Sequence, residues 1–138
     1  MGKYSTIKIL KPFIPLVLLA FSLAACSIIH RKTPVMLFAG KPVFREDIIE
    51  VEKSIKGSAL EGMDPKYAYV LLVGYQIERH GRFDGDFKKA EREFEEFLVE
   101  RTGKADNPYT IRDIIEKRKT LIKDTLEFLL AKYRVKLK

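Results

Sequence analysis

An uncharged run of 18 residues, Pro12 to Ile29, separates a lysine-bearing start from a strongly charged remainder. Lys3, Lys8 and Lys11 precede the run. Positive charge stays on the cytoplasmic side of a membrane while an apolar stretch enters it. The run is also within the range of about 17 to 25 residues that a spanning helix needs. We therefore expect the folded domain to be built from the residues that follow the run.

The end of this run, Leu23-Ala24-Ala25-Cys26, resembles the lipobox of bacterial lipoproteins. Small residues before a cleaved bond are typical of secretory signals. The resemblance implies that residues 1–25 are a signal peptide cleaved between Ala25 and Cys26, and that Cys26 carries acyl chains such as palmitate. Two or three acyl chains anchor a protein stably, whereas one holds only marginally. The expected partner is therefore a membrane, reached through Cys26.

The same resemblance implies an exported protein. Ser27 stands where lipoproteins retained in the inner membrane commonly have aspartate. In a host with two membranes we therefore expect the outer membrane and a domain facing the periplasm, and otherwise the cell membrane. An uncleaved spanning anchor, with Cys26 as an ordinary small residue, is the alternative. Pro12 and Pro15 near the start of the run argue against it.

The composition argues against disulfide bonds and against a nucleic-acid partner. Cys26 is the only cysteine, so after acylation the exported domain can form no disulfide. The formal net charge of +7 falls to about +4 when the three signal lysines are removed. That charge is too small and too mixed to indicate a nucleic-acid partner. The length of the remaining chain suits a single domain.

Residues 26–43 are interpreted as the lipidated cysteine and a flexible tether, because prolines and a glycine interrupt any helical period. Val35, Met36, Leu37 and Phe38 break the polarity of this segment. Four exposed apolar residues in a row are unusual. They are expected either to pack on the domain or to bind a partner, and they are the candidate partner-binding residues.

Helical periodicity and end signals recur through residues 44–138, the predicted helical domain. They predict helices over 44–56, 65–80, 87–101 and about 24 residues from Thr110. Residues 67–77 also suit a buried strand, although Asp64-Pro65 favours a helix start. Four helices with short connections predict an all-α bundle. The last helix is expected to bury one stripe: Ile111, Ile114, Ile115, Ile122, Leu126, Leu129 and Tyr133.

A second pattern within residues 70–108 is similar to the tetratricopeptide helix pair, which carries Leu-Gly, Ala-x-x-x-Phe and a closing proline. The pattern here is Val70-x-x-Val73-Gly74-x-x-Ile77, Ala90-x-x-x-Phe94 and Pro108. Val70 and Ile77 stand where the family has Trp and Tyr, and the pattern occurs once. The resemblance implies a related helix-pair scaffold and assigns no binding residues.

Two groups of polar residues next to the third predicted helix are candidates for metal or acid–base chemistry. Asp84 and Asp86 have the spacing of a calcium loop but lack its other ligands, so helix capping is the favoured role. His80 is expected to be a surface residue at a helix end, because His30 is the only other histidine available to complete a site.

Charged groups on the later helices suggest surface networks. Glu93, Glu96 and Glu100 lie within reach of one another on a helix, but their charged neighbours favour a solvated network over paired-carboxylate catalysis. The basic tail, residues 132–138, is expected to stabilise a helix C-terminus, with contact to anionic lipid as the alternative. We therefore predict no catalytic residues, no metal site and no cofactor.

These patterns favour a lipid-anchored envelope protein whose helical domain binds another envelope protein, as an adaptor or assembly factor. One alternative is a small carrier or enzyme with a pocket between helices near Tyr67, Tyr69 and Tyr75. The other alternative is a purely structural envelope lipoprotein.

Overall fold

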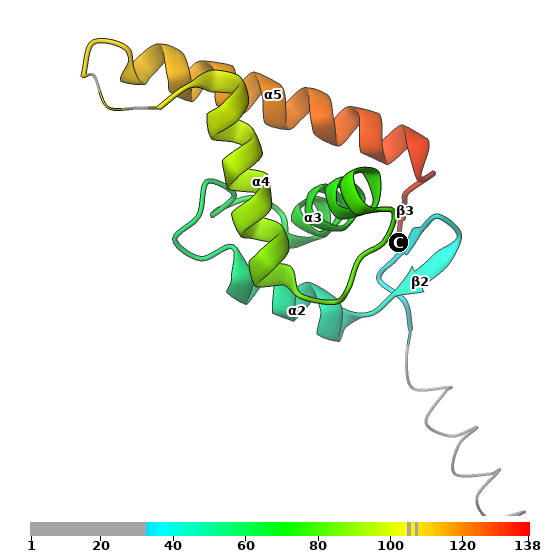
Figure 1. Ribbon diagram of the computed structural model, residues 1–138. Helices are drawn as coiled ribbons and strands as arrows, with labels where there is room; N and C mark the ends of the chain where they lie inside the picture. The colour runs from blue at the N-terminus through cyan, green and yellow to red at the C-terminus, as the bar shows by residue number, and fades with distance from the viewer. Residues whose placement is uncertain (1–32, 105, 107) are drawn as a thin grey trace, which may run out of the picture. The chain divides into compact units, whose positions relative to one another are not determined.

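Four helices and a small three-stranded sheet form the part of the chain that the computed structural model describes, residues 33–104, 106 and 108–138 (Figure 1). The helices are α2 (Arg45–Ser54), α3 (Pro65–His80), α4 (Phe87–Thr102) and α5 (Ile111–Lys132), and the strands are β1 (Met36–Phe38), β2 (Lys41–Val43) and β3 (Lys136–Leu137). The four predicted helices are confirmed, and residues 67–77 are helical. The prediction of an all-α bundle is confirmed in part, because the described part of the chain is mostly helical but also contains the small three-stranded sheet.

Helix α3 is the central element and contacts the three other helices (Figure 1). It is uncharged from Tyr67 to Ile77, and a helix that is apolar on all sides is stable only when it is surrounded. At Gly74, an added Cβ would lie 3.0 Å from the Cδ atoms of Leu129. The absence of a side chain at Gly74 therefore allows α5 to approach α3 closely.

The helix ends follow the signals in the sequence. The Asp64 carboxylate accepts a hydrogen bond from the Lys66 backbone N–H at 3.0 Å, and Pro65 occupies the first turn of α3. At the start of α4, the Asp86 carboxylate accepts from the Lys89 N–H at 3.1 Å. Gly81 ends α3 with φ of 80°, a conformation that glycine adopts without strain.

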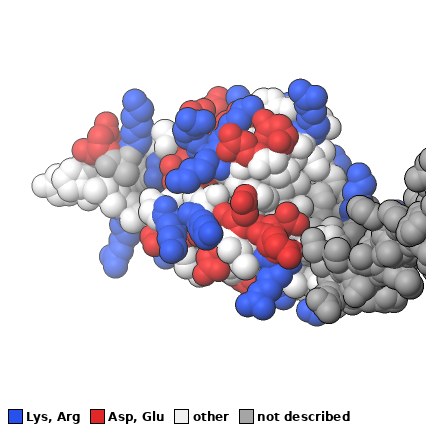
Figure 2. Space-filling model, turned by 90° about the horizontal axis from the view of Figure 1, so that it is seen from below, with Lys and Arg blue, Asp and Glu red and all other residues white. Residues whose placement is uncertain are grey.

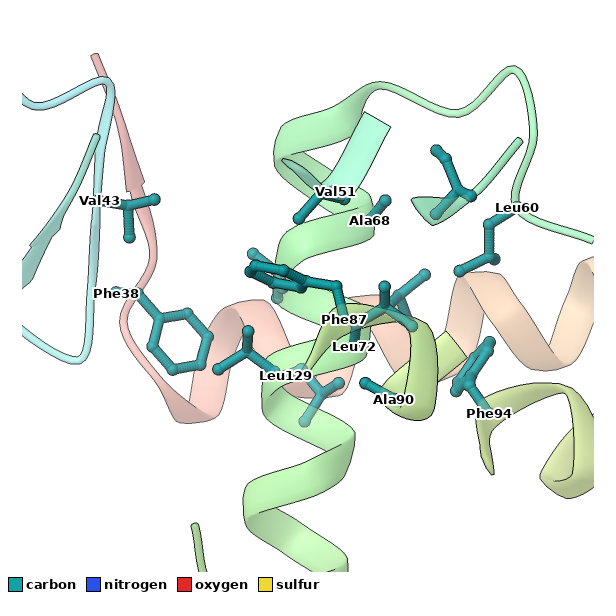
Figure 3. Packing of buried hydrophobic residues seen from close by; sticks show 14 of the residues in the cluster. Phe38, Val43, Val51, Leu60, Ala68, Leu72, Phe87, Ala90, Phe94 and Leu129 are labelled. Carbon is teal, nitrogen blue, oxygen red and sulfur yellow. The ribbon is translucent and has the colours of Figure 1, made fainter. Parts of the chain in front are cut away.

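The hydrophobic core joins all four helices and the sheet (Figure 3). Helix α4 buries one face against α3, as its spacing predicts: Phe87, Ala90, Phe94 and Leu98. Val51 of α2 and Leu60 of the α2–α3 connection close the core on one side. Phe38 and Val43 reach it from the strands (Figure 3).

The sheet replaces much of the predicted tether. Strands β1 and β2 form a hairpin in which Phe38 pairs with Lys41, and its turn, Ala39-Gly40, has positive φ at both residues. Strand β3 pairs with the other edge of β1, with Met36 opposite Leu137. Residues 36–43 of the segment that was interpreted as a tether therefore form this hairpin. Strands this short leave little periodicity to detect, and one partner strand lies at the other end of the chain.

Helix α5 has nearly the predicted ends but buries less of its predicted apolar stripe. Only Ile114 and Leu129 of the predicted stripe are buried, whereas Ile111 and Ile115 are exposed. The first turns of α5 reach beyond α3, so little of the protein covers them (Figure 1). The helix ends at Lys132, close to its predicted end, and the basic tail continues into β3.

Arg118 of α5 forms hydrogen bonds with the C-terminal end of α4. Its Nε donates to Thr102 Oγ1 at 2.9 Å, and its Nη2 donates to the Gly103 carbonyl oxygen at 2.8 Å. We expect Arg118→Met to lower the free energy of unfolding by about 1 to 2 kcal/mol in urea denaturation. Arg112→Met, at an exposed position of the same helix, is the control, and equal losses would contradict this role.

Candidate functional site

The segment predicted to bind a partner lies in β1 and beside it. Met36 and Phe38 are 0% and 6% exposed, so these two side chains pack on the domain. Val35 and Leu37 are half-buried. Ala25 and Cys26, the predicted cleavage and lipidation residues, lie outside the described residues. Packing on the domain, one of the two expected alternatives, is therefore confirmed for Met36 and Phe38.

Phe38 connects three elements that are far apart in the sequence. Its ring stacks on Tyr133 with centroids 4.8 Å apart, and it meets Tyr69 of α3 edge-on at 5.9 Å. The Ala39 N–H also donates to the Tyr133 carbonyl oxygen at 2.7 Å. The hairpin, α3 and the residues after α5 are thereby held together at one end of the domain.

Two hollows flank the hairpin tip, Ala39-Gly40. The first, about 510 Å³, lies between the tip and the residues after α5, and its basic lining residues are Lys132, Arg134 and Lys136. The second, about 470 Å³, lies between the hairpin and α3, and its basic lining residues are Lys41 and Arg82. Neither lining includes Asp or Glu. Both volumes are within the range of small-molecule sites.

Of the three tyrosines expected near a pocket, Tyr69 lines the second hollow. Burial, followed by the nearby Asp47 carboxylate, raises the pKa of Tyr69 to about 12, so its hydroxyl stays protonated. Tyr75 instead packs edge-on against Phe94 of α4 at 5.5 Å, and its hydroxyl accepts from Arg79. The structure therefore does not bring Tyr69 and Tyr75 together in one pocket.

Glu78 of α3 binds the first two residues of the basic tail, Lys132 and Tyr133. Its carboxylate pairs with the Lys132 ammonium and accepts a hydrogen bond from the Tyr133 hydroxyl at 2.9 Å. The hydrogen bond from Lys132, and then that from Tyr133, lowers the pKa of Glu78. Burial, and then Glu78, raises the pKa of Tyr133 to about 12. Glu78 thus offsets the charge of Lys132 and fixes the direction in which the tail leaves α5.

A polar cluster that the sequence reasoning did not identify joins α3 and α4. Glu93 accepts hydrogen bonds from the buried Gln76 and from His80 Nε2, the latter at 2.9 Å. The bond with His80, then that with Gln76, lowers the pKa of Glu93. His80 and Gln76 lie 13 and 17 positions from Glu93 in the sequence. Only the packing of one face of α3 against one face of α4 could have indicated this cluster. No Ser, Thr or Cys belongs to this cluster, so it favours helix packing over nucleophilic chemistry.

Asp84 and Asp86 have the capping role that was favoured. The Asp84 carboxylate accepts from the Asp86 N–H at 3.0 Å and pairs with Lys89 Nζ, also at 3.0 Å. These two bonds, in that order, lower the pKa of Asp84. Glu96 and Glu100 remain exposed on α4. Within the described ranges, no group of three His, Cys, Asp or Glu residues is arranged to hold a metal ion.

An apolar groove runs between α5 and the α2–α3 connection. It has a volume of about 350 Å³, and its apolar lining residues are Ala59, Leu60, Met63, Ile122 and Leu126. Helical spacing places Ile111 and Ile115 on the same face of α5, beyond the end of this groove. Ile111 is 36% exposed and Ile115 is 44% exposed. This stretch, which we call the α5 groove, is a surface that could receive an apolar segment of another protein.

The chain matches no protein-family model, no curated protein and no solved structure. What the protein does must therefore be inferred from its own residues. None of the helices in the described part of the chain is both long and apolar enough to cross a membrane.

Proposed function

We propose that this protein is a lipid-anchored envelope protein, held in the membrane through Cys26, whose helical domain binds another envelope protein as an adaptor or assembly factor. The anchor is supported by the sequence Leu23-Ala24-Ala25-Cys26 behind a lysine-bearing apolar run. In this proposal residues 1–25 are removed, and the domain is tethered to the membrane by the short segment between Cys26 and Pro34.

The observation that carries the binding role is the α5 groove. Most exposed isoleucines on a protein surface stand alone, whereas Ile111 and Ile115 lie one turn apart beside a groove with an apolar lining. Lys119, Lys123 and Glu61 also line the groove, so its charged lining is positive on balance. An amphipathic helix with acidic residues flanking its apolar face would suit this arrangement, since such helices place apolar side chains in grooves at intervals of three and four residues.

A second candidate function, a carrier of a small amphipathic molecule, is favoured by the hollow between the hairpin and α3. Phe38, Tyr69 and Val73 contribute to its lining, and Lys41 and Arg82 add positive charge. Such a hollow would suit a ligand with an apolar body and an anionic group. A purely structural envelope role is the third candidate and needs neither surface.

The test is a pull-down of the C-terminally tagged protein from native membranes in mild detergent, with intact-mass analysis of the bait. We expect a bait that begins at an acylated Cys26 and one stoichiometric envelope partner. The double variant Ile111→Ser/Ile115→Ser should retain the acylated bait and lose most of the partner, because truncating central apolar contacts commonly costs more than 1 kcal/mol each.

The matched control is Ile49→Ser, because Ile49 is 41% exposed but belongs to α2. It should retain the partner. A bait that keeps residues 1–25 without acyl chains would overturn the anchor. An acylated bait without a partner, or a partner lost equally in both variants, would overturn the binding role of the α5 groove. A co-purifying lipid or small molecule in place of a protein would favour the carrier.

A further inference from the structure

Positive charge is concentrated at one end of the domain. The segments 34–45 and 132–138 together contain six Lys or Arg and no Asp or Glu: Lys41, Arg45, Lys132, Arg134, Lys136 and Lys138. Residues 46–131 contain 15 Lys or Arg and 19 Asp or Glu. The net charge of the domain is thus positive at the end made by these two segments and negative over the rest.

The sheet brings the two basic segments together. Strand β1 lies between β2, which carries Lys41, and β3, which carries Lys136. The Lys138 N–H donates to the Val35 carbonyl oxygen at 3.2 Å, so the last residues lie beside the start of the domain. We call the surface formed by Lys41, Arg134, Lys136 and Lys138 the basic end.

All four cations of the basic end are exposed. Among the described residues, none of them forms an ion pair with a carboxylate, in contrast to Lys132, which pairs with Glu78. On the face drawn in Figure 2, by contrast, acidic and basic side chains are interspersed. Unpaired cations gathered on one surface attract a surface of opposite charge, whereas mixed charges largely cancel.

The chain upstream of the domain joins it at this same end, since Pro34 and Val35 lead into the hairpin at Met36. Seven residues lie between Cys26 and Pro34, so eight Cα–Cα steps join them, and at most about 3.3 to 3.6 Å per step gives roughly 28 Å for a fully extended chain. This segment also contains Arg31 and Lys32. An acylated Cys26 would therefore keep Pro34, where the chain enters this end of the domain, within roughly 28 Å of the lipid-bearing residue.

We propose that the basic end binds the anionic phospholipid headgroups of the membrane in which the protein is anchored, so that the domain has a fixed orientation. The orientation rests on the proposed anchor at Cys26, whereas the attraction to anionic lipid does not. Headgroup phosphates attract Lys and Arg within about a Debye length, roughly 8 Å at physiological ionic strength. The acidic remainder of the domain is repelled and faces away, which leaves the α5 groove accessible to a partner.

Binding of the mature chain, residues 26–138 with Cys26→Ser, to sedimented vesicles tests the attraction without the anchor. The vesicles are phosphatidylcholine alone or phosphatidylcholine with about 30% phosphatidylglycerol. We expect binding to the anionic vesicles only, weakening as salt is raised. The variant Lys41→Gln/Lys136→Gln/Lys138→Gln should bind about 100-fold more weakly, or about fivefold per charge removed.

The matched control, Lys56→Gln/Lys117→Gln/Lys123→Gln, removes the same net charge from exposed positions outside the basic end and should lose less than about threefold. Circular dichroism verifies that both variants are folded. Equal losses in both variants, equal binding to neutral vesicles or no vesicle binding would overturn the proposal. Competition by millimolar inorganic phosphate at constant ionic strength, or binding to isolated peptidoglycan in place of vesicles, would also overturn it. None of these outcomes bears on acylation, which the bait mass measures separately.

Discussion

Replacing Phe38 by alanine is expected to lower the free energy of unfolding by about 3 to 5 kcal/mol. The side chain is 6% exposed and packs between Tyr133 and Tyr69. Its removal deletes both ring contacts and leaves a cavity where the hairpin, α3 and the tail after α5 meet. A loss of that size is a large part of the total stability of a small domain. Urea denaturation followed by circular dichroism measures it.

The matched control is Phe128→Ala, because Phe128 is 56% exposed on α5. The same chemical change there should cost less than about 1 kcal/mol. If residues up to 43 were a flexible tether, Phe38→Ala would have no more effect than Phe128→Ala. That result would contradict the hairpin as part of the domain, and a large difference between the two variants would support it.

Replacing Glu91 by glutamine is expected to stabilise the protein at pH 8. Glu91 Oε1 is buried and has no hydrogen-bond partner among the described residues. Burial, followed by the neighbouring Glu95 carboxyl, raises the pKa of Glu91 from 4.5 to about 7. At pH 8 the folded protein therefore holds a partly buried, poorly compensated negative charge. Glutamine has nearly the same shape without the charge, and solvent screening at this partly exposed position reduces the effect, so the free energy of unfolding should rise by about 1 kcal/mol.

The contribution of Glu91 to the stability of the folded protein is expected to fall as the pH rises. Between about pH 4.5 and about pH 7, Glu91 is protonated in the folded protein and ionised in the unfolded chain. The folded state then binds more protons, so the stability of the wild type falls as the pH rises through this window. Below pH 4.5 the residue is neutral in both states, and the advantage of the Glu91→Gln variant should disappear.

Thermal unfolding at pH 4 and pH 8 measures this difference, and Glu96→Gln is the control because Glu96 is exposed on the same helix. Glu78, Asp84 and Glu93 have lowered pKa values, so their contributions to stability change with pH in the opposite direction. These contributions cancel when the stability of the wild type is subtracted from that of the variant at each pH. A variant that is no more stable than the wild type at pH 8, or equally stabilised at both pH values, would contradict this account.

Local sequence signals predicted the helices well because their determinants lie within a few residues of one another. Asp64-Pro65 and Asp86 marked the starts of α3 and α4, and both carboxylates accept backbone hydrogen bonds at those ends. The spacing of Phe87, Phe94 and Leu98 predicted the buried face of α4. The capping role of Asp84 and Asp86 was likewise a local inference.

Contacts between distant residues could not be predicted in this way. The Gln76–His80–Glu93 cluster depends on how α3 and α4 pack, and the role of Arg118 depends on where α4 ends against α5. The α5 groove was missed because Ile111 and Ile115 belong to a regular apolar stripe. Periodicity indicates which residues share a face, but not whether a neighbouring element covers it.

By itself the sequence determined the four helices, their ends and most of the face that α4 buries, because propensity, capping and periodicity act over one or two turns. It also supplied Leu23-Ala24-Ala25-Cys26, which resembles a lipobox and on which the proposed anchor depends. Only the tertiary structure decided the three-stranded sheet, the burial of Phe38, the raised pKa of Glu91 and the gathering of cations at the basic end. Each of these depends on burial, or on contacts between residues far apart in the chain, that only folding creates.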